Sequence, residues 1–139
     1  MWIGFDPGRD KCGRAIVAVD SSSRYVIVDL AVVRSPQAVA QLQADCQRYA
    51  VQAIALGNST TSRQWHQDLS AALGAVLGDA APPLISVDER NTTLEARDRY
   101  WLLFPPRGLQ RLIPGGLRMP PRPVDDVAAL LLLERYFNF

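Results

Sequence analysis

The sequence contains little cysteine, histidine and lysine, and it has no long apolar run. Its two cysteines, Cys12 and Cys46, have no metal-ligand spacing, so a reduced cytosolic protein is the simplest interpretation. The longest apolar run, residues 127–133, is far shorter than the roughly 20 residues of a membrane-spanning helix. No basic segment followed by a long apolar stretch opens the sequence, so no signal peptide is expected. We therefore predict a cytoplasmic protein that does not associate with membranes.

Arginine replaces lysine almost completely. Among 15 basic residues only Lys11 is a lysine, and the net charge of +1 excludes a polycationic chain. Arginine presents a planar, two-pronged donor that suits phosphate groups. An arginine-rich genome would produce the same bias, so both explanations stay open. With 139 residues, of which 48% are hydrophobic and 21% charged, the chain is expected to fold as a single domain over residues 1–139.

The pattern of apolar residues predicts an α/β fold built on a mixed five-stranded sheet. Short connections indicate that the first three strands form an antiparallel meander. Later strands, each reached through a helix, are expected to run parallel. The strands are expected at residues 2–5, 13–20, 25–33, 53–57 and 81–89. Helices on both faces of the sheet are expected at residues 35–50, 61–78 and 93–104, and from residue 124 onward.

Two helix starts and one loop have distinctive composition. Capping boxes are expected where Thr precedes Gln or Glu by three residues, at Thr61–Gln64 and Thr92–Glu95. Residues 105–123 contain six of the ten prolines, which predicts an irregular loop rather than a helix or strand. Long loops in compact domains are usually functional or mobile.

Acidic residues stand where three predicted elements should converge. Asp6 ends the first strand, Asp88-Glu89 ends the fifth, and Asp125-Asp126 opens the last helix. Because the carboxyl ends of parallel strands meet at one edge of a sheet, these acids are expected to gather there. Gathered carboxylates repel unless a cation neutralises them, and hard oxygen ligands suit Mg²⁺ or Mn²⁺. Each acid also has a structural alternative, as a turn residue, a helix cap or a partner of the helix dipole.

Two glycines follow the first of these acids in the stretch "IGFDPGRDKCGRAIVA". Gly8 is expected to permit a tight reversal with positive φ. Gly13, which has no side chain, is expected to let the returning strand lie close to a ligand. The predicted strand would hold Asp6 rigidly, so its carboxylate can be aimed at a metal ion.

Basic residues surround the expected acidic site. Six arginines and a single acid lie between residues 97 and 122, in a chain whose net charge is only +1. Such a surface would bind a phosphate backbone, although a solvated helix face and loop would look the same. The candidate nucleic-acid-binding residues are Arg9, Lys11, Arg63, Arg90, Arg107, Arg111 and Arg118. Trp101 and Phe104 have the spacing of core residues, and His66 is expected on a helix surface.

Four segments resemble motifs of one protein family. They are "GFDPGRDKCGRAIV", "ALGNSTTSR", "VDERNTTLEAR" and "VDDVAALLLLERYF", which occur in the family's order over nearly the whole chain. They resemble the YqgF family, also called RuvX, within the RNase H-like superfamily that includes the RuvC Holliday-junction resolvases. The third segment is the most specific match. No acid follows the fourth predicted strand, where RuvC resolvases carry one.

The resemblance implies an RNase H-like fold and metal-dependent cleavage of nucleic acid. It assigns catalytic and metal-binding roles to Asp6, Glu89 and Asp125, with Asp88 and Asp126 as further metal-ligand candidates. It implies a Mg²⁺ or Mn²⁺ nuclease that processes the 5′ end of precursor 16S rRNA, acting as a monomer or weak homodimer. A resolvase of branched DNA and a non-catalytic RNA-binding module for ribosome assembly are the alternatives. An ATPase of the actin type would need two such domains.

Overall fold

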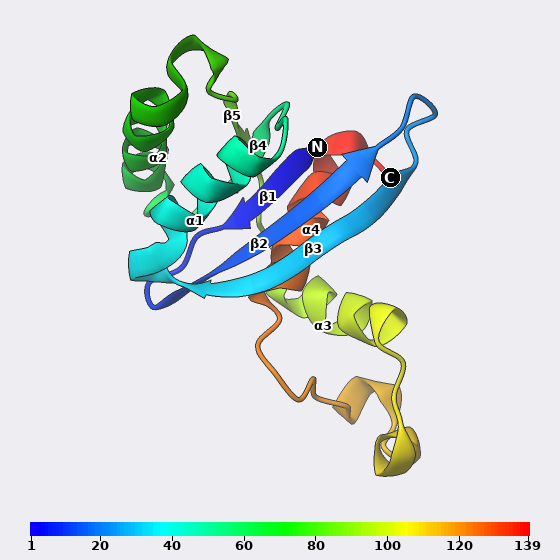
Figure 1. The fold of residues 1–139 in the computed structure, drawn as a ribbon. Coiled ribbons are helices and arrows are strands. Elements are labelled where there is room, and N and C mark those ends of the chain that lie inside the picture. Colours follow the sequence, from blue (N-terminus) through cyan, green and yellow to red (C-terminus); the bar gives the residue numbers. More distant parts are fainter.

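The computed structural model describes residues 1–139 as a five-stranded sheet with helices on both faces (Figure 1). Its strands are β1 (Trp2–Asp6), β2 (Lys11–Val19), β3 (Tyr25–Arg34), β4 (Ile54–Gly57) and β5 (Leu84–Val87). The order across the sheet is β3-β2-β1-β4-β5, with the first three strands antiparallel and β4 and β5 parallel to β1. The mixed sheet predicted from the sequence is therefore confirmed.

Four α-helices cover the sheet. They are α1 (Ser35–Arg48), α2 (Ser62–Leu77), α3 (Thr92–Leu103) and α4 (Asp125–Phe137). Helices α1 and α2 lie on one face, whereas α4 crosses the other face with α3 packed against it (Figure 1). A short 3₁₀ turn, η1 (Gly78–Ala80), follows α2. None of the helices is both long and apolar enough to cross a membrane.

The two predicted capping boxes are wrong. Neither Thr61 nor Asn91, the residues that precede α2 and α3, makes a side-chain cap hydrogen bond. A capping residue usually has an extended backbone, but Thr61 has φ −96° and ψ 1°, and Asn91 is left-handed with φ 63°. The Thr92 hydroxyl instead donates to the Glu89 carbonyl at 2.8 Å, so it closes the turn before α3.

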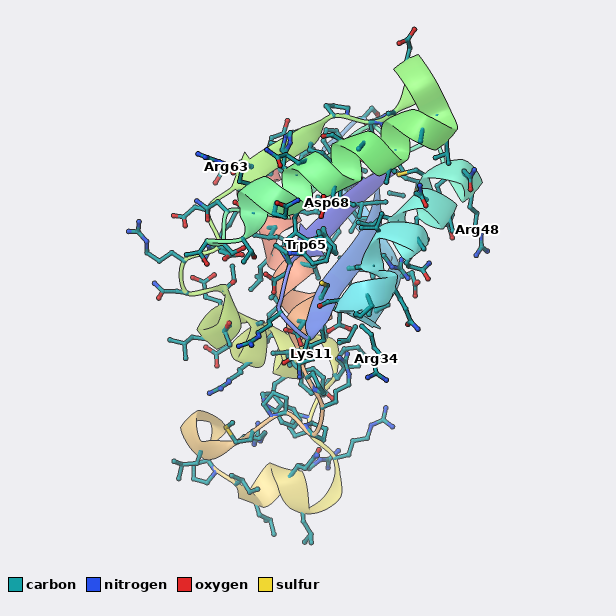
Figure 2. All side chains as sticks on the ribbon, turned by 90° about the vertical axis from the view of Figure 1, so that its left-hand side faces the viewer. Lys11, Arg34, Arg48, Arg63, Trp65 and Asp68 are labelled. Carbon is teal, nitrogen blue, oxygen red and sulfur yellow. The ribbon has the colours of Figure 1, made fainter.

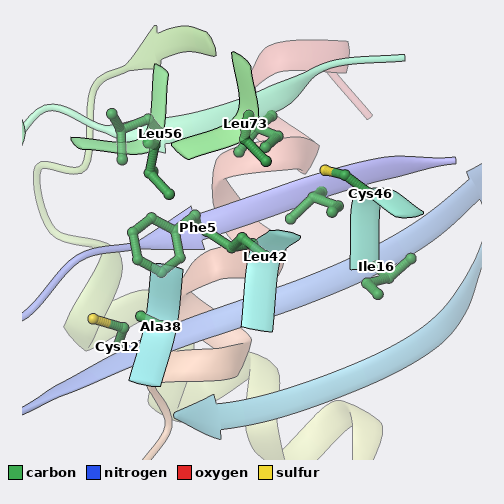
Figure 3. Packing of buried hydrophobic residues seen from close by; sticks show 11 residues of the cluster. Phe5, Cys12, Ile16, Ala38, Leu42, Cys46, Leu56 and Leu73 are labelled. Atoms are coloured by element: carbon green, nitrogen blue, oxygen red, sulfur yellow. The ribbon is translucent and has the colours of Figure 1, made fainter. Parts of the chain in front are cut away.

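Alternating side chains of the central strands form two cores. On the face of α1 and α2, Ile3 and Phe5 of β1 pack with Leu42, Leu56 and other buried residues (Figure 3). On the opposite face, small and branched residues of the strands pack against α4. Because successive side chains of a strand point to opposite faces, β1 contributes residues to the core on each side of the sheet.

Helix α4 lies unusually close to the sheet because two glycines face it. A Cβ built on Gly4 would lie 2.1 Å from the Ala129 carbonyl oxygen, and one on Gly13 would lie 1.7 Å from the Asp125 carbonyl oxygen. The prediction that Gly13 makes room for a ligand is therefore wrong, because it makes room for the start of α4. The prediction of positive φ at Gly8 is also wrong, since only Gly78 and Gly108 among the glycines have it.

Residues 105–123, which we call the arm, extend away from the sheet below α3 (Figure 1). The expected absence of α-helix and strand is confirmed. The arm is nevertheless not wholly irregular, because it contains two 3₁₀ turns, η2 (Gly108–Leu112) and η3 (Gly115–Leu117). Gly108 enters the first turn with φ 57°, a conformation that favours glycine.

Candidate active site

The ends of three parallel strands bring two of the predicted acids together. Phe5 of β1 lies opposite Leu56 of β4, so Asp6 follows at the level of Gly57. Glu89 lies two residues beyond the end of β5. A Cβ on Gly57 would lie 2.3 Å from Glu89 Oε2, which shows that this carboxylate rests on the glycine. Asp6 and Glu89 therefore lie at the same edge of the sheet, close enough for each to shift the pKa of the other.

The pKa of both carboxyl groups is raised above its ordinary value. Burial, followed by the charge and hydrogen bond of Glu89 and the charge of Asp125, raises the pKa of Asp6 to about 7. Burial is also the main cause that raises the pKa of Glu89, whereas its hydrogen bond with Asp6 opposes the rise. Glu89 Oε2 is buried without a hydrogen-bond partner. The pair is therefore short of positive charge and of donors.

Asp125, the third predicted ligand, begins α4 beside this pair. The carbonyl of Asp125 packs against Gly13, and its Oδ2 lies 3.9 Å from Lys11 Nζ. Asp125 is close enough for its charge to raise the pKa of Asp6. As the side chains stand, however, no three Asp, Glu, His or Cys residues converge into a metal-binding cluster. The structure thus forms a close pair of acids with a third acid nearby.

The remaining two metal-ligand candidates hold local structure. The Asp88 carboxylate accepts a hydrogen bond from the Arg90 N–H at 2.9 Å. Asp126 is buried, and its Oδ1 accepts from Arg122 at 2.9 Å and from the Val127 N–H at 2.8 Å. The Asp88 side chain therefore stabilises the turn before α3, and the Asp126 side chain stabilises the start of α4.

The sequence assigned no positioning role to two residues that hold the acids in place. Asn58 Oδ1 accepts from the Glu89 N–H at 3.1 Å, so it fixes the backbone that carries this acid. Arg135 of α4 donates to the carbonyls of Asp88 and Arg90, each at 2.7 Å. A polar residue directly after a core strand was a usable signal for Asn58. Arg135 lies in the last turn of α4, where arginine is common, so nothing in the sequence marked it as a positioning residue.

Comparison with known proteins identifies the architecture. No family model matches the sequence, and no curated protein matches it. Solved structures do match: Thermus thermophilus RuvC in complex with a Holliday junction substrate superposes with TM-score 0.57 at 18% identity, over 99% of this chain and 94% of that chain. The fowlpox virus resolvase in complex with Holliday junction DNA superposes with TM-score 0.63 at 13% identity, over 99% and 96%. The chain has a RuvC-like, RNase H-like fold.

A further structural match is the yeast mitochondrial Holliday junction resolvase Ydc2, with TM-score 0.50 at 14% identity over 98% of this chain and 76% of that chain. The RuvC-like fold confirms the fold expected from the sequence motifs. Assignment to the YqgF branch stays a prediction, because the matches reach only the wider group of RuvC-like proteins.

Within this RuvC-like fold the donor set fits a hard divalent cation. Carboxylate oxygens are the ligands that Mg²⁺ and Mn²⁺ prefer. The partnerless Glu89 Oε2 and the raised pKa of Asp6 show that the pair lacks a positive partner within the chain. Asp6 and Glu89, with Asp125, are therefore the residues able to hold such an ion.

Two hollows flank the acids. One of about 280 Å³ lies where the arm joins the sheet, and its lining includes Lys11, Arg97, Arg122 and Asp125. Figure 2 shows Lys11 between the body of the molecule and the arm. The other hollow, of about 700 Å³, is lined by Pro7, Gly8, Arg9, Thr60, Thr61, Gln64, Trp65 and Asp68. The first hollow has an excess of basic residues, whereas in the second Arg9 is balanced by Asp68.

The predicted nucleic-acid-binding residues divide into two sets. Most are exposed to solvent, namely Arg9, Lys11, Arg63, Arg90, Arg107 and Arg111. Arg118 is half-buried, and its guanidinium donates to the carbonyls of Gln110 at 3.0 Å and Ile113 at 2.9 Å. It therefore holds the arm in shape while keeping its positive charge.

Proposed function

We propose that this protein is a divalent-metal-dependent nuclease that hydrolyses phosphodiester bonds in structured nucleic acid. The observation that carries the proposal is the close approach of Asp6 and Glu89 at one edge of the sheet, with the buried Glu89 Oε2 left without a partner. Two carboxyl groups in contact are stable only if they share a proton or a cation. A site of this kind next to a basic hollow suits a phosphate substrate.

Each residue has a separate role in this proposal. Asp6, Glu89 and Asp125 would hold Mg²⁺ or Mn²⁺, and Asn58 would keep Glu89 in place. The bound ion supplies an activated water and stabilises the negative charge that develops around phosphorus. Lys11, half exposed beside Asp125, would contact the phosphate backbone next to the bond that is cut.

Two substrates are candidates for this site. The YqgF-like motifs favour precursor 16S rRNA, whose 5′ end would be processed. The structural matches favour branched DNA, because the RuvC and fowlpox structures were determined with Holliday junctions. Both substrates are structured nucleic acids in which base-paired segments meet at a bend or a branch.

The test compares both substrates in one assay. Labelled 5′ fragments of precursor 16S rRNA, a four-way DNA junction and a continuous duplex are incubated with Mg²⁺, Mn²⁺ or EDTA. We expect cleavage of one structured substrate with metal only. Asp6→Asn should lower the rate roughly a thousandfold, equivalent to about 4 kcal/mol in the barrier, while binding persists. Asp79→Asn, in the exposed turn η1, is the matched control.

Three results would contradict the proposal. Cleavage that is unaffected by EDTA would reject the role of a metal ion. Cleavage by Asp6→Asn at the wild-type rate would reject this site. Binding without cleavage under every metal condition would support the non-catalytic RNA-binding alternative instead.

A further inference from the structure

The arm presents apolar side chains to solvent at the tips of its turns. Leu109 and Leu112 of η2 are 81% and 79% exposed, and Leu117 of η3 is 74% exposed. Such a group of exposed leucines is unusual on a protein without a partner and marks a surface that meets another molecule.

The arm is held in a defined shape rather than hanging free. Arg118 bonds the carbonyls of η2 and of the segment after it, and its guanidinium stacks 5.4 Å over the Trp101 ring of α3. The Trp101 indole in turn donates to the Arg118 carbonyl at 3.4 Å. At the root, Arg122 pairs with Asp126 and lies over the rings of Tyr100 and Phe104. The leucines are thus displayed on a preorganised support.

The charge of the arm indicates what kind of partner the leucines meet. The arm includes four arginines, Arg107, Arg111, Arg118 and Arg122, and no Asp or Glu. Two arms of this charge would repel each other, which disfavours a contact between copies of the chain. An anionic partner would be attracted instead.

The position of the arm points to the same partner. Its last residues run directly into Val124 and Asp125, so the end of the arm and Asp125 line the same hollow. A nucleic acid bound with a phosphate at the acids would therefore also pass along the arm. Leucine, isoleucine, methionine and proline are the side chains that proteins insert between base steps as wedges.

We propose that the arm is an apolar wedge which enters an open base step of a branched nucleic acid, an inference that rests on the proposed nuclease function. Leu109, Leu112 and Leu117 form the edge of the wedge, and the arginines around them hold the phosphates on either side. At a branch point one stacking face is already open, so insertion there costs less than in a continuous duplex. The wedge would thereby select branched over continuous substrates.

The experiment uses a four-way junction with 2-aminopurine at the branch point and a continuous duplex of the same sequence, both in EDTA. Wild-type protein should raise the branch-point fluorescence about threefold or more, because the probe becomes unstacked. The variant Leu109→Ser/Leu112→Ser should lose this signal and about tenfold of its preference for the junction, while its duplex affinity stays within about twofold. Val26→Ser/Val28→Ser, which removes exposed side chains from β3, is the matched control.

Each other outcome overturns the wedge. Wild-type saturation without a fluorescence change, or a full signal from the leucine variant, rejects it. Sedimentation that shows a wild-type dimer and a monomeric leucine variant would assign the arm to self-association. If the leucine variant cuts the junction with wild-type selectivity, the wedge fails and the nuclease stands. If wild-type protein binds no nucleic acid at all, both fail.

Discussion

Helix α4 and the arm adjoin in the sequence, yet they are stabilised by different interactions. Eight consecutive residues of α4, Asp126 to Leu133, are buried, as in a helix enclosed on all sides. No residue of η2 or η3 is buried, and the arm depends on hydrogen bonds from arginine to backbone carbonyls. Close packing fixes the acids, whereas polar bonds fix the surface that we propose meets a nucleic acid. We therefore expect changes in one region to leave the other intact, and the predictions below are ordered by their effect on stability.

Gly13→Ala should have the largest effect, because it separates α4 from the sheet. Its new Cβ would lie 1.7 Å from the Asp125 carbonyl oxygen, a backbone atom that cannot move alone. We expect a loss of about 3 kcal/mol, or roughly 10 °C in Tm by calorimetry. Gly74→Ala in α2 is the control, because no atom lies within 4 Å of its Cβ, and it should stabilise by up to about 1 kcal/mol. Equal melting of the two variants would show that α4 is not held by this contact.

Asp6→Asn should stabilise the metal-free protein at high pH. The folded-state pKa of Asp6 is about 7 and its ordinary value is 3.8, so the folded state binds the extra proton between these values. The stability that protonated Asp6 supplies is complete below pH 4 and is lost as the pH rises through 7. Asparagine mimics the protonated acid, so in EDTA at pH 8 the variant should be more stable by about 2 kcal/mol.

The melting experiment is repeated with added Mn²⁺ and, as a control, at pH 4. Mn²⁺ should raise the Tm of the wild type and leave that of Asp6→Asn nearly unchanged, because the cation stabilises the ionised pair. At pH 4 the two proteins should melt together. A variant that is less stable than the wild type at pH 8 would contradict the assignment of the raised pKa.

Gly57→Ala should alter the acids with little effect on the fold. Its Cβ would meet the end of the Glu89 side chain, which can swing aside, rather than backbone. We expect a stability change below about 1 kcal/mol but loss of the Mn²⁺-induced rise in Tm. If Mn²⁺ raises the Tm of the variant as much as that of the wild type, packing of Glu89 against Gly57 is not required for metal binding.

Arg118→Gln should have the smallest effect on stability and act on the arm alone. It removes two hydrogen bonds to carbonyls and the stacking on Trp101, all outside the buried core. We expect a change in Tm of at most about 2 °C, together with several-fold faster tryptic cleavage after Arg107 and Arg111. Unchanged proteolysis would indicate that the arm is held by something else, and a large fall in Tm would link it to the core.

The same division explains what the sequence could predict. The sheet followed from apolar periodicity and from connection lengths, which are local properties. The rule that parallel strands end at one edge placed Asp6 near Asp88 and Glu89, and only the family resemblance singled out Glu89. The close approach of α4 did not, because a glycine facing a helix and a glycine facing a ligand look alike in the sequence. For that reason Gly13 was expected to face a ligand, whereas it faces the start of α4.

Neighbouring acids posed a similar problem. Asp125 and Asp126 are adjacent and equally acidic, and only the direction of each side chain separates them. Asp126 is buried against Arg122, while Asp125 faces Lys11 and the other acids. The arm was beyond prediction because its turns depend on Arg118 reaching a carbonyl eight residues away and on the Trp101 ring of a preceding helix. Tertiary contacts of this kind leave no periodic pattern.

The packing of α4 on Gly4 and Gly13 also sets an order of events during protein synthesis. Asp6 leaves the ribosome long before Asp125, and the first strand must wait for the last helix before both acids stand on one rim. A nascent chain that lacks α4 therefore lacks Asp125, the third acid of the proposed metal site. Any hydrolysis that depends on this rim can begin only after translation of the helix has finished.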